Sequence, residues 1–501
     1  MSIKKLAGET AIYGMSSILG RVLNFALMPL YTQIFQREAY GNVVFIYATI
    51  AFLMVFFTYR MEMAYFRFGT EKNIERKTTF NTAITSLIVS TIILAVIAGI
   101  GVPYYAVFSG LENFQVYLYL GLGIICLDTL CELPYAELRL EGRPLRFAAI
   151  RLTSIAVNLG LNLFFLLFCP WALTEPSLLG IHPLLQQVYS PDIGIGYIFI
   201  ANLVASLVTF LLLVPSFKHY QFLFDRLLWK RMLSYILPLV IVGLAYLINE
   251  NLDKLLLPGL LSGTMEENKA ALGEYGACYK LAILIALFTQ AFRYGAEPFF
   301  FRNKNEHNAR QLYAQVAKYF LIVGLIGFLV VVLYIDIFKL LIRNEAYWNG
   351  LKIVPIVLLA NVLAGLYYNF SVWYKLIDQT QWGAYISVGG AMITILLNIW
   401  WIPLIGYMGS AWATLICYTA MTFACYFFGR KYYPVPYPIE KMIFYLLLAV
   451  GLYGLSNWLG RFHNGGLIFD LSVNTLILMT FIGIVFLLER KSLKVVLQRK
   501  R

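Results

Sequence analysis

The sequence predicts an all-α, polytopic integral membrane protein with about fourteen transmembrane helices. The 501 residues are 60% hydrophobic and only 13% charged, and the mean hydropathy is +0.73. A soluble domain, by comparison, is about 45–50% apolar and about 25% charged. Apolar runs near the ~20 residues that a bilayer-crossing helix needs recur along the whole chain. This composition excludes a cytosolic enzyme and a disordered chain, because neither could keep so much apolar surface in water.

Each predicted helix is an apolar run bounded by short polar connections, which leave no room for a soluble domain. The eleventh and twelfth runs are separated only by a predicted tight turn at Pro403–Gly406. The predicted spans are roughly 9–35, 40–66, 80–108, 113–138, 147–170, 194–217, 232–256, 274–301, 312–342, 352–374, 383–404, 406–429, 441–460 and 467–488.

The net charge of +13 would suggest a nucleic-acid partner in a soluble protein, but here the basic residues follow the topology. With the N-terminus in the cytoplasm, the inner connections and the tail hold 26 of the 39 Lys and Arg residues, and the outer connections hold 5. This is the positive-inside bias of membrane proteins. It predicts that both termini are cytoplasmic, and we expect no nucleic-acid partner.

Cysteine and histidine patterns predict no metal site and no disulfide. The six cysteines form no CxxC pair and lie in or beside apolar runs, so we interpret them as small buried apolar residues. The four histidines fall in connecting segments. No nucleotide-binding or hydrolase motif is present, so we predict that the chain is not an enzyme.

Two segments of the chain resemble each other, which indicates an internal repeat. Residues 40–67 match residues 275–302 at nine of 28 positions without gaps, and several matches are polar residues or glycine. A shift of six spans keeps the orientation, so the repeats are parallel and related by an axis along the membrane normal. Two lobes around such an axis are typical of a transporter. The predicted parts are an N-lobe at 1–220, a C-lobe at 228–432, and a helix pair with a basic tail at 440–501.

Eight Lys and Arg residues remain inside the predicted spans. Lys318 and Lys339 lie near helix ends, from which a long side chain can reach the interface. A deeper cation costs about 2.5–3.5 kcal/mol even on the insertion scale, so it should face the interior, paired or hydrated. We expect a cationic cavity for an anionic headgroup such as a diphosphate, because an Arg guanidinium can hold two phosphate oxygens at once. The candidates are Arg21, Arg60, Lys280 and Arg293.

Other polar residues inside the spans have both a functional and a structural interpretation, and the sequence leaves both open. Candidates for sugar contacts, or for interhelical hydrogen bonds, are Asn24, Tyr31, Asn158 and Asn162. Asp128 and Glu132, which share one helix face, are candidates for coupling to H⁺ or Na⁺, or for ion pairing. Candidate structural or gating pairs involve Glu62, Arg67, Asp253, Lys254, Glu297 and Arg302.

Several short motifs occur in a fixed order along the chain. They are Gly20-Arg21, Pro29-Leu30-Tyr31 and Tyr40-Gly41 near the start, then Asn249-Glu-Asn-Leu-Asp253-Lys254, Glu274-Tyr275-Gly276, Lys280 and Glu297-Pro298-Phe299. In this order and topology the chain resembles the polysaccharide (Wzx-type) flippases of the multidrug/oligosaccharidyl-lipid/polysaccharide exporter superfamily. The fourteen spans are also similar to the related lipid II flippases, whose last two helices form a lipid-tail groove.

The resemblance implies a monomeric transporter of the bacterial inner membrane. It would move an undecaprenyl-diphosphate-linked oligosaccharide, as in O-antigen or capsule assembly, from the inner to the outer leaflet by alternating access. It implies no cofactor beyond a coupling H⁺ or Na⁺, and partners limited to the lipid-linked glycan, membrane lipids and polysaccharide polymerase machinery. The alternatives are a lipid II flippase, a multidrug or cation antiporter of the same superfamily, and a membrane enzyme such as a glycan polymerase.

Overall fold

The computed structural model describes residues 14, 18–20, 22, 25–71, 73–175, 180–218, 220–304, 306–462 and 466–498. Within these ranges all regular structure is helical. Thirteen helical segments are long and apolar enough to cross a membrane, and they correspond to the second to fourteenth predicted spans. The first predicted span, 9–35, lies mostly outside the described residues, which show its final turns as α2 (Met28–Ile34).

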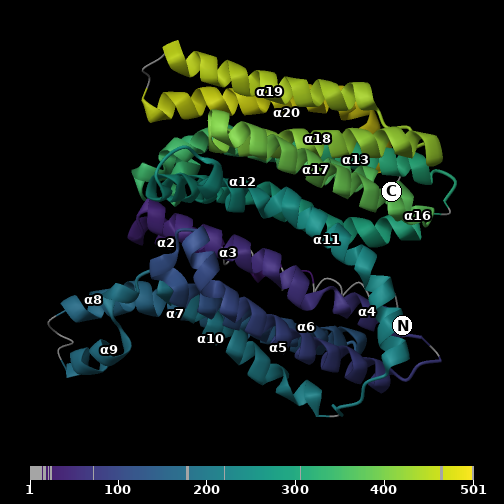
Figure 1. Ribbon diagram of the computed structural model, residues 1–501. Coiled ribbons are helices and arrows are strands. Elements are labelled where there is room, and N and C mark those ends of the chain that lie inside the picture. The colour runs from purple at the N-terminus through teal and green to yellow at the C-terminus, as the bar shows by residue number, and fades with distance from the viewer. Residues whose placement is uncertain are drawn as a thin grey trace. The chain divides into compact units, whose positions relative to one another are not determined.

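The chain divides into two compact units. Figure 1 shows the helices of both and labels them where there is room. Unit 1 contains residues 1–276 and 398–407, and unit 2 contains residues 277–397 and 408–501. The predicted lobes at 1–220 and 228–432 remain a prediction. Helices α12 (Met265–Arg302) and α17 (Gln381–Ile405) contribute to both units, and the first residue of α18, Tyr407, belongs to unit 1.

Unit 1 is a helical bundle. Its helices, besides α2, are α3 (Arg37–Thr58), α4 (Met61–Phe68), α5 (Arg76–Phe108), α6 (Gln115–Leu140), α7 (Pro144–Leu163), α8 (Cys169–Thr174), α9 (His182–Val188), α10 (Gly196–Leu213) and α11 (Arg226–Leu260). Helix α6 packs between α5 and α10, and α3 packs on α6 and α11. A cluster of buried apolar side chains joins α4, α5, α6 and α11 and includes Met61, Tyr65, Ile84 and Met232.

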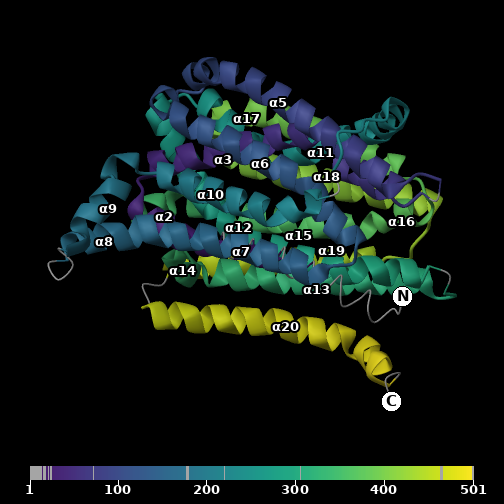
Figure 2. The same cartoon turned by 90° about the horizontal axis from the view of Figure 1, so that it is seen from below.

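Unit 2 contains α13 (Ala309–Leu333), α14 (Ile335–Phe338), α15 (Val354–Phe370), α16 (Val372–Leu376), α18 (Tyr407–Tyr432), α19 (Ile439–Phe462) and α20 (Leu467–Gln498). Its central helix is α13, which packs against α15, α19 and α20. Helix α20 is long and curves near its C-terminal end (Figure 2).

Two predicted spans differ from the structure. The span predicted at 40–66 is broken, because Tyr59 and Arg60 adopt left-handed backbone conformations with φ of 32° and 58° between α3 and α4. The span predicted at 312–342 ends at Leu333, and the short α14 and the 3₁₀ turn η6 (Lys339–Leu341) follow it. A turn separates α17 from α18 as predicted, but it is shorter than the predicted Pro403–Gly406: α17 continues through Pro403 to Ile405, and Gly406, with φ +63°, joins it to α18.

The cysteines agree with their predicted role. All six are thiols rather than members of a disulfide, and five of them are buried, with Cys126 half-buried. They fill apolar space inside the bundle.

Candidate functional site

Arg60 lies at a break inside a membrane-spanning segment. The left-handed conformation costs an L-residue about 1–2 kcal/mol, and here two non-glycine residues adopt it in succession. The guanidinium rests against Gly243 of α11, where a Cβ atom would lie 2.9 Å from one of its terminal nitrogens. The Arg60 side chain is 35% exposed, and its terminal nitrogen is 4.0 Å from a carboxylate oxygen of Glu62. The local fold therefore presents a cation while keeping it beside an acid.

Asp128 and Glu132 occupy one face of α6, as the sequence predicts. Asp128 lies near Ser206 of α10 and Arg151 of α7. The Arg151 guanidinium lies 5.0 Å from the ring centre of Tyr135, which is one turn beyond Glu132. Unit 1 thus places two half-buried acids near an exposed arginine, and acids within a membrane span can hold a proton or a small cation.

Tyr31 and Asn162 are joined directly. The Tyr31 hydroxyl donates to Asn162 Oδ1 at 2.8 Å, and the Asn162 amide donates to the backbone and side-chain oxygens of Asn158 at 2.8 and 3.0 Å. Asn162 is fully buried. These three candidates for sugar contacts therefore make an interhelical hydrogen-bond network that ties α2 to α7.

Arg293 and Lys280 are both on the part of α12 that belongs to unit 2. The Arg293 guanidinium lies 4.4 Å from the ring centre of Tyr368, and Lys375 Nζ lies 4.9 Å from the same ring. Two cations thus meet one aromatic ring on α15, an attraction that is stronger where water is excluded. Arg293 is exposed, whereas Lys280 is half-buried.

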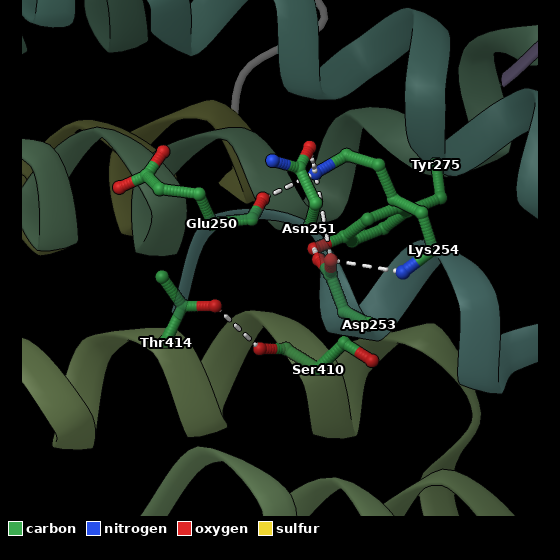
Figure 3. A network of polar contacts seen from close by, with 7 residues as sticks. All are labelled: Glu250, Asn251, Asp253, Lys254, Tyr275, Ser410 and Thr414. Carbon is green, nitrogen blue, oxygen red and sulfur yellow. Dashed lines mark hydrogen bonds and ion pairs between the residues drawn. The ribbon is translucent and has the colours of Figure 1, made fainter. Parts of the chain in front are cut away.

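Asp253 and Lys254 belong to a polar cluster on α11 (Figure 3). Lys254 Nζ is 3.4 Å from Asp253 Oδ1 and donates to the Glu250 backbone oxygen at 2.6 Å. The Tyr275 hydroxyl of α12 donates to the other Asp253 oxygen. Asp253 is buried, so the cluster ties α11 firmly to the start of α12.

The remaining predicted candidates have a mixed outcome. Arg67 stacks 4.3 Å from the ring centre of Tyr235 on α11, and Glu62 is paired with Arg60. Arg21 and Asn24 lie outside the described residues, as do the side chains of Glu297 and Arg302.

The sequence did not reveal a close crossing of two helices in unit 1. The crossing lies at the end of unit 1 that the positive-inside bias predicts to face the outside of the membrane. Gly41 of α3 and Gly273 of α12 approach so closely that a Cβ on Gly41 would lie 2.8 Å from the Lys269 carbonyl carbon. Beside them Arg37 pairs with Glu274, and Tyr407 donates to Glu274 at 3.3 Å. The Tyr40-Gly41 and Tyr275-Gly276 repeat motifs flank this crossing, so the repeat itself was the available signal.

A second feature missed from sequence is a buried ion network in unit 2. Lys318, expected to reach the membrane interface, instead pairs with Glu489 of α20, and their side chains are 7% and 1% exposed. Tyr445 donates to Glu489 at 2.8 Å, and Lys441 lies 3.4 Å from it. Glu489 stands in a cluster of charged residues at the chain's end, so composition alone gave no reason to bury it.

No protein-family model and no curated protein sequence matches the chain. Solved structures do match. The lipid II flippase MurJ, in an inward closed conformation, is 15% identical and covers 95% of this chain and 99% of its own, with a TM-score of 0.73. An inward-facing multidrug resistance MATE family transporter of the MOP superfamily is 15% identical and covers 82% and 94%, with a TM-score of 0.59. The Vibrio cholerae MATE transporter VcmN in the bent form is 12% identical and covers 84% and 96%, with a TM-score of 0.54.

These likenesses establish the fold, which is that of the MOP-superfamily transporters. The all-α prediction is therefore confirmed, and the neighbours are transporters rather than enzymes. The match to MurJ covers 95% of this chain. The residues it leaves unmatched are fewer than those in α19 and α20 together, so part of the C-terminal helix pair is matched.

Proposed function

We propose that this protein is a flippase that moves an undecaprenyl-diphosphate-linked oligosaccharide from the cytoplasmic to the outer leaflet of a bacterial inner membrane by alternating access. The carrying observation is the cation Arg60, held in a strained backbone break within a membrane span of a MOP-type fold. Strained, non-glycine left-handed residues persist where the surrounding structure over-determines them, and they concentrate at functional sites. The diphosphate of a lipid-linked substrate suits such a cation, because a guanidinium can bind two phosphate oxygens at once.

The cations support an anionic rather than a cationic substrate. Arg60, Arg293 and Lys280 all lie in membrane-spanning helices, and Arg60 is spaced from its acid by 4.0 Å. A drug or cation antiporter would instead favour an acid-dominated cavity. We propose Arg21, which is identified from the sequence alone, as a fourth residue that contacts the diphosphate.

Asp128 and Glu132 are the proposed coupling groups. Asp128 lies near the neutral Ser206 hydroxyl and the positively charged Arg151. Gain or loss of a proton or of Na⁺ at Asp128 would therefore change its electrostatic attraction to that arginine. Tyr31, Asn158 and Asn162 are already engaged with one another, so sugar contacts would have to be made by their remaining donor and acceptor capacity.

The test is deletion in the native host followed by identification of the lipid that accumulates. The proposal expects a diphosphate-linked oligosaccharide trapped on the cytoplasmic leaflet, with loss of the surface glycan. Arg60→Ala and Arg293→Ala should each fail to restore transport while expressing normally, and Arg226→Ala, an exposed arginine at the start of α11, is the matched control. A normal surface glycan after deletion, in a host without a paralogue, would contradict the proposal.

A lipid II flippase is the second candidate, because the likeness to MurJ has a TM-score of 0.73 and reaches into the C-terminal helix pair. The same deletion separates the two candidates. Accumulation of lipid II with arrested peptidoglycan synthesis would select this candidate, and rescue of a cell depleted of its lipid II flippase would support it further.

A further inference from the structure

Unit 2 contains a cavity that the proposed transport does not use. It has a volume of 260 Å³ and lies where α13 and α14 end, beside the 3₁₀ segment η7 (Glu345–Ile353), the start of α15 and the second half of α19. Its chemistry-bearing side chains are Asp336, Lys339, Trp348, Lys352, Tyr453 and Asn457.

The lining of the cavity carries more positive than negative charge. Lys339 Nζ is 2.5 Å from Asp336 Oδ1 and 4.7 Å from the centre of the Trp348 ring. The Trp348 indole is itself fixed, because it donates to the Ile342 backbone oxygen at 3.0 Å. Lys352 adds a second cation to the lining, so two positive charges face one negative charge.

The position of the cavity matches a membrane–water interface. It lies beyond the C-terminal end of the α13 span and at the N-terminal end of the α15 span. Tryptophan and tyrosine with lysine are the side chains that concentrate at that depth. Tyr453 is held in place by Phe328 of α13, whose ring centre is 6.0 Å away.

Helix α19 continues the site into the bilayer. Tyr453 and Asn457 share one helix stripe with Val450 and Ile443, at helical spacings of three, four and seven residues. Val450 and Ile443 are 37% and 52% exposed. An amphiphile with its anionic group in the cavity could therefore lay its acyl chains along this apolar stripe.

We propose that this cavity binds the phosphate of an anionic phospholipid, as a resident lipid distinct from the transported substrate. Lys339 and Lys352 neutralise the phosphate, Trp348 and Tyr453 hold the glycerol region, and Asn457 supplies a hydrogen bond. Asp336 limits the affinity, because it already engages Lys339.

The test uses the purified, delipidated full-length protein and counts bound phosphatidylglycerol by native mass spectrometry. Phosphatidylcholine with the same acyl chains should bind more weakly. Lys339→Gln and Lys352→Gln should each weaken phosphatidylglycerol binding about fivefold, since a basic residue near an anionic lipid surface contributes about 1 kcal/mol. Asp336→Asn should strengthen it, and Arg343→Gln, which removes an exposed cation of the same connection that does not line the cavity, should leave it unchanged.

The opposite sign expected for Asp336→Asn separates binding from general damage to the fold. Equal binding of the two lipids, or an equal loss in Arg343→Gln, would overturn the proposal. Displacement of the lipid by glycerol phosphate or inorganic phosphate at similar concentration would assign the site to a soluble anion and would also overturn it.

Discussion

The crossing of α3 and α12 at Gly41 and Gly273 predicts a large effect from the smallest possible substitution. In Gly41→Ala, the added Cβ would overlap the Lys269 carbonyl oxygen and lie 2.8 Å from its carbon and 3.1 Å from the Gly273 nitrogen. Ordinary contact begins at 3.4 Å. The carbonyl carbon alone therefore requires a separation of about 0.6 Å and the nearer oxygen requires more, which forfeits much of the dispersion energy between the helices.

The cost should lie in the upper part of the range for overpacked sites, about 3 kcal/mol, because the obstructing atoms are backbone and cannot rotate away. The assay is thermal unfolding of the purified full-length protein in detergent, followed by tryptophan fluorescence. We expect the midpoint to fall by roughly 6 °C, from a shift of about 2 °C for each kcal/mol in a large domain. Gly273→Ala should behave alike, because its Cβ would meet the Arg37 carbonyl.

Gly454→Ala on α19 is the matched control, since a Cβ there meets no atom within 4 Å. Its midpoint should be unchanged or slightly higher, because alanine favours a helix over glycine. If Gly41→Ala unfolds at the same temperature as the control, the backbones are not in close contact and the reasoning fails.

Two other perturbations follow from buried polar groups. Lys318→Met should destabilise the protein by up to about 3 kcal/mol, because Glu489 loses its buried cationic partner while Tyr445 and Lys441 remain. The double change with Glu489→Leu should recover most of the unfolding midpoint, and no recovery would contradict a role for the ion pair. Gly243→Val should abolish transport as Arg60→Ala does, because the valine occupies the space that the Arg60 guanidinium uses. Gly259→Val, on the same helix and with open space around it, should remain active in a complementation assay. Equal loss of transport in both variants would contradict a specific role for the contact between Gly243 and Arg60.

The sequence predicted the helices well because hydropathy reports the solvent around a helix, and the bilayer fixes its length. It could not predict the break at Tyr59 and Arg60, since neither residue favours the left-handed conformation. That conformation is imposed by tertiary packing, including the space at Gly243. The backbone preferences of Tyr59 and Arg60 contain no information about Gly243, which is far along the chain.

The contacts within the candidate site were harder to predict from the sequence than the helices, because they too depend on tertiary packing. Arg60 was found because a cation in an apolar run is conspicuous, and Tyr31 and Asn162 because their side chains can form hydrogen bonds within a span. Their mutual hydrogen bond depends on how α2 meets α7, a rotation that no spacing rule specifies. Lys318 shows the converse, because a lysine near a helix end reads as interfacial until the partner acid on α20 is seen.

The polar contacts that join α20 to α13 limit how these two helices can move. Helix α20 is tied to α13 at two levels: Asn474 donates to the Leu333 backbone oxygen at 2.7 Å, and Glu489 pairs with Lys318 at the other end of α13. The two polar contacts are fifteen residues apart on each helix, which is about 22 Å at 1.5 Å per residue, so they prevent both sliding and rotation. Helices α13 and α20 should therefore travel as a single lever, so spin labels placed on the two would report a constant separation throughout a transport cycle.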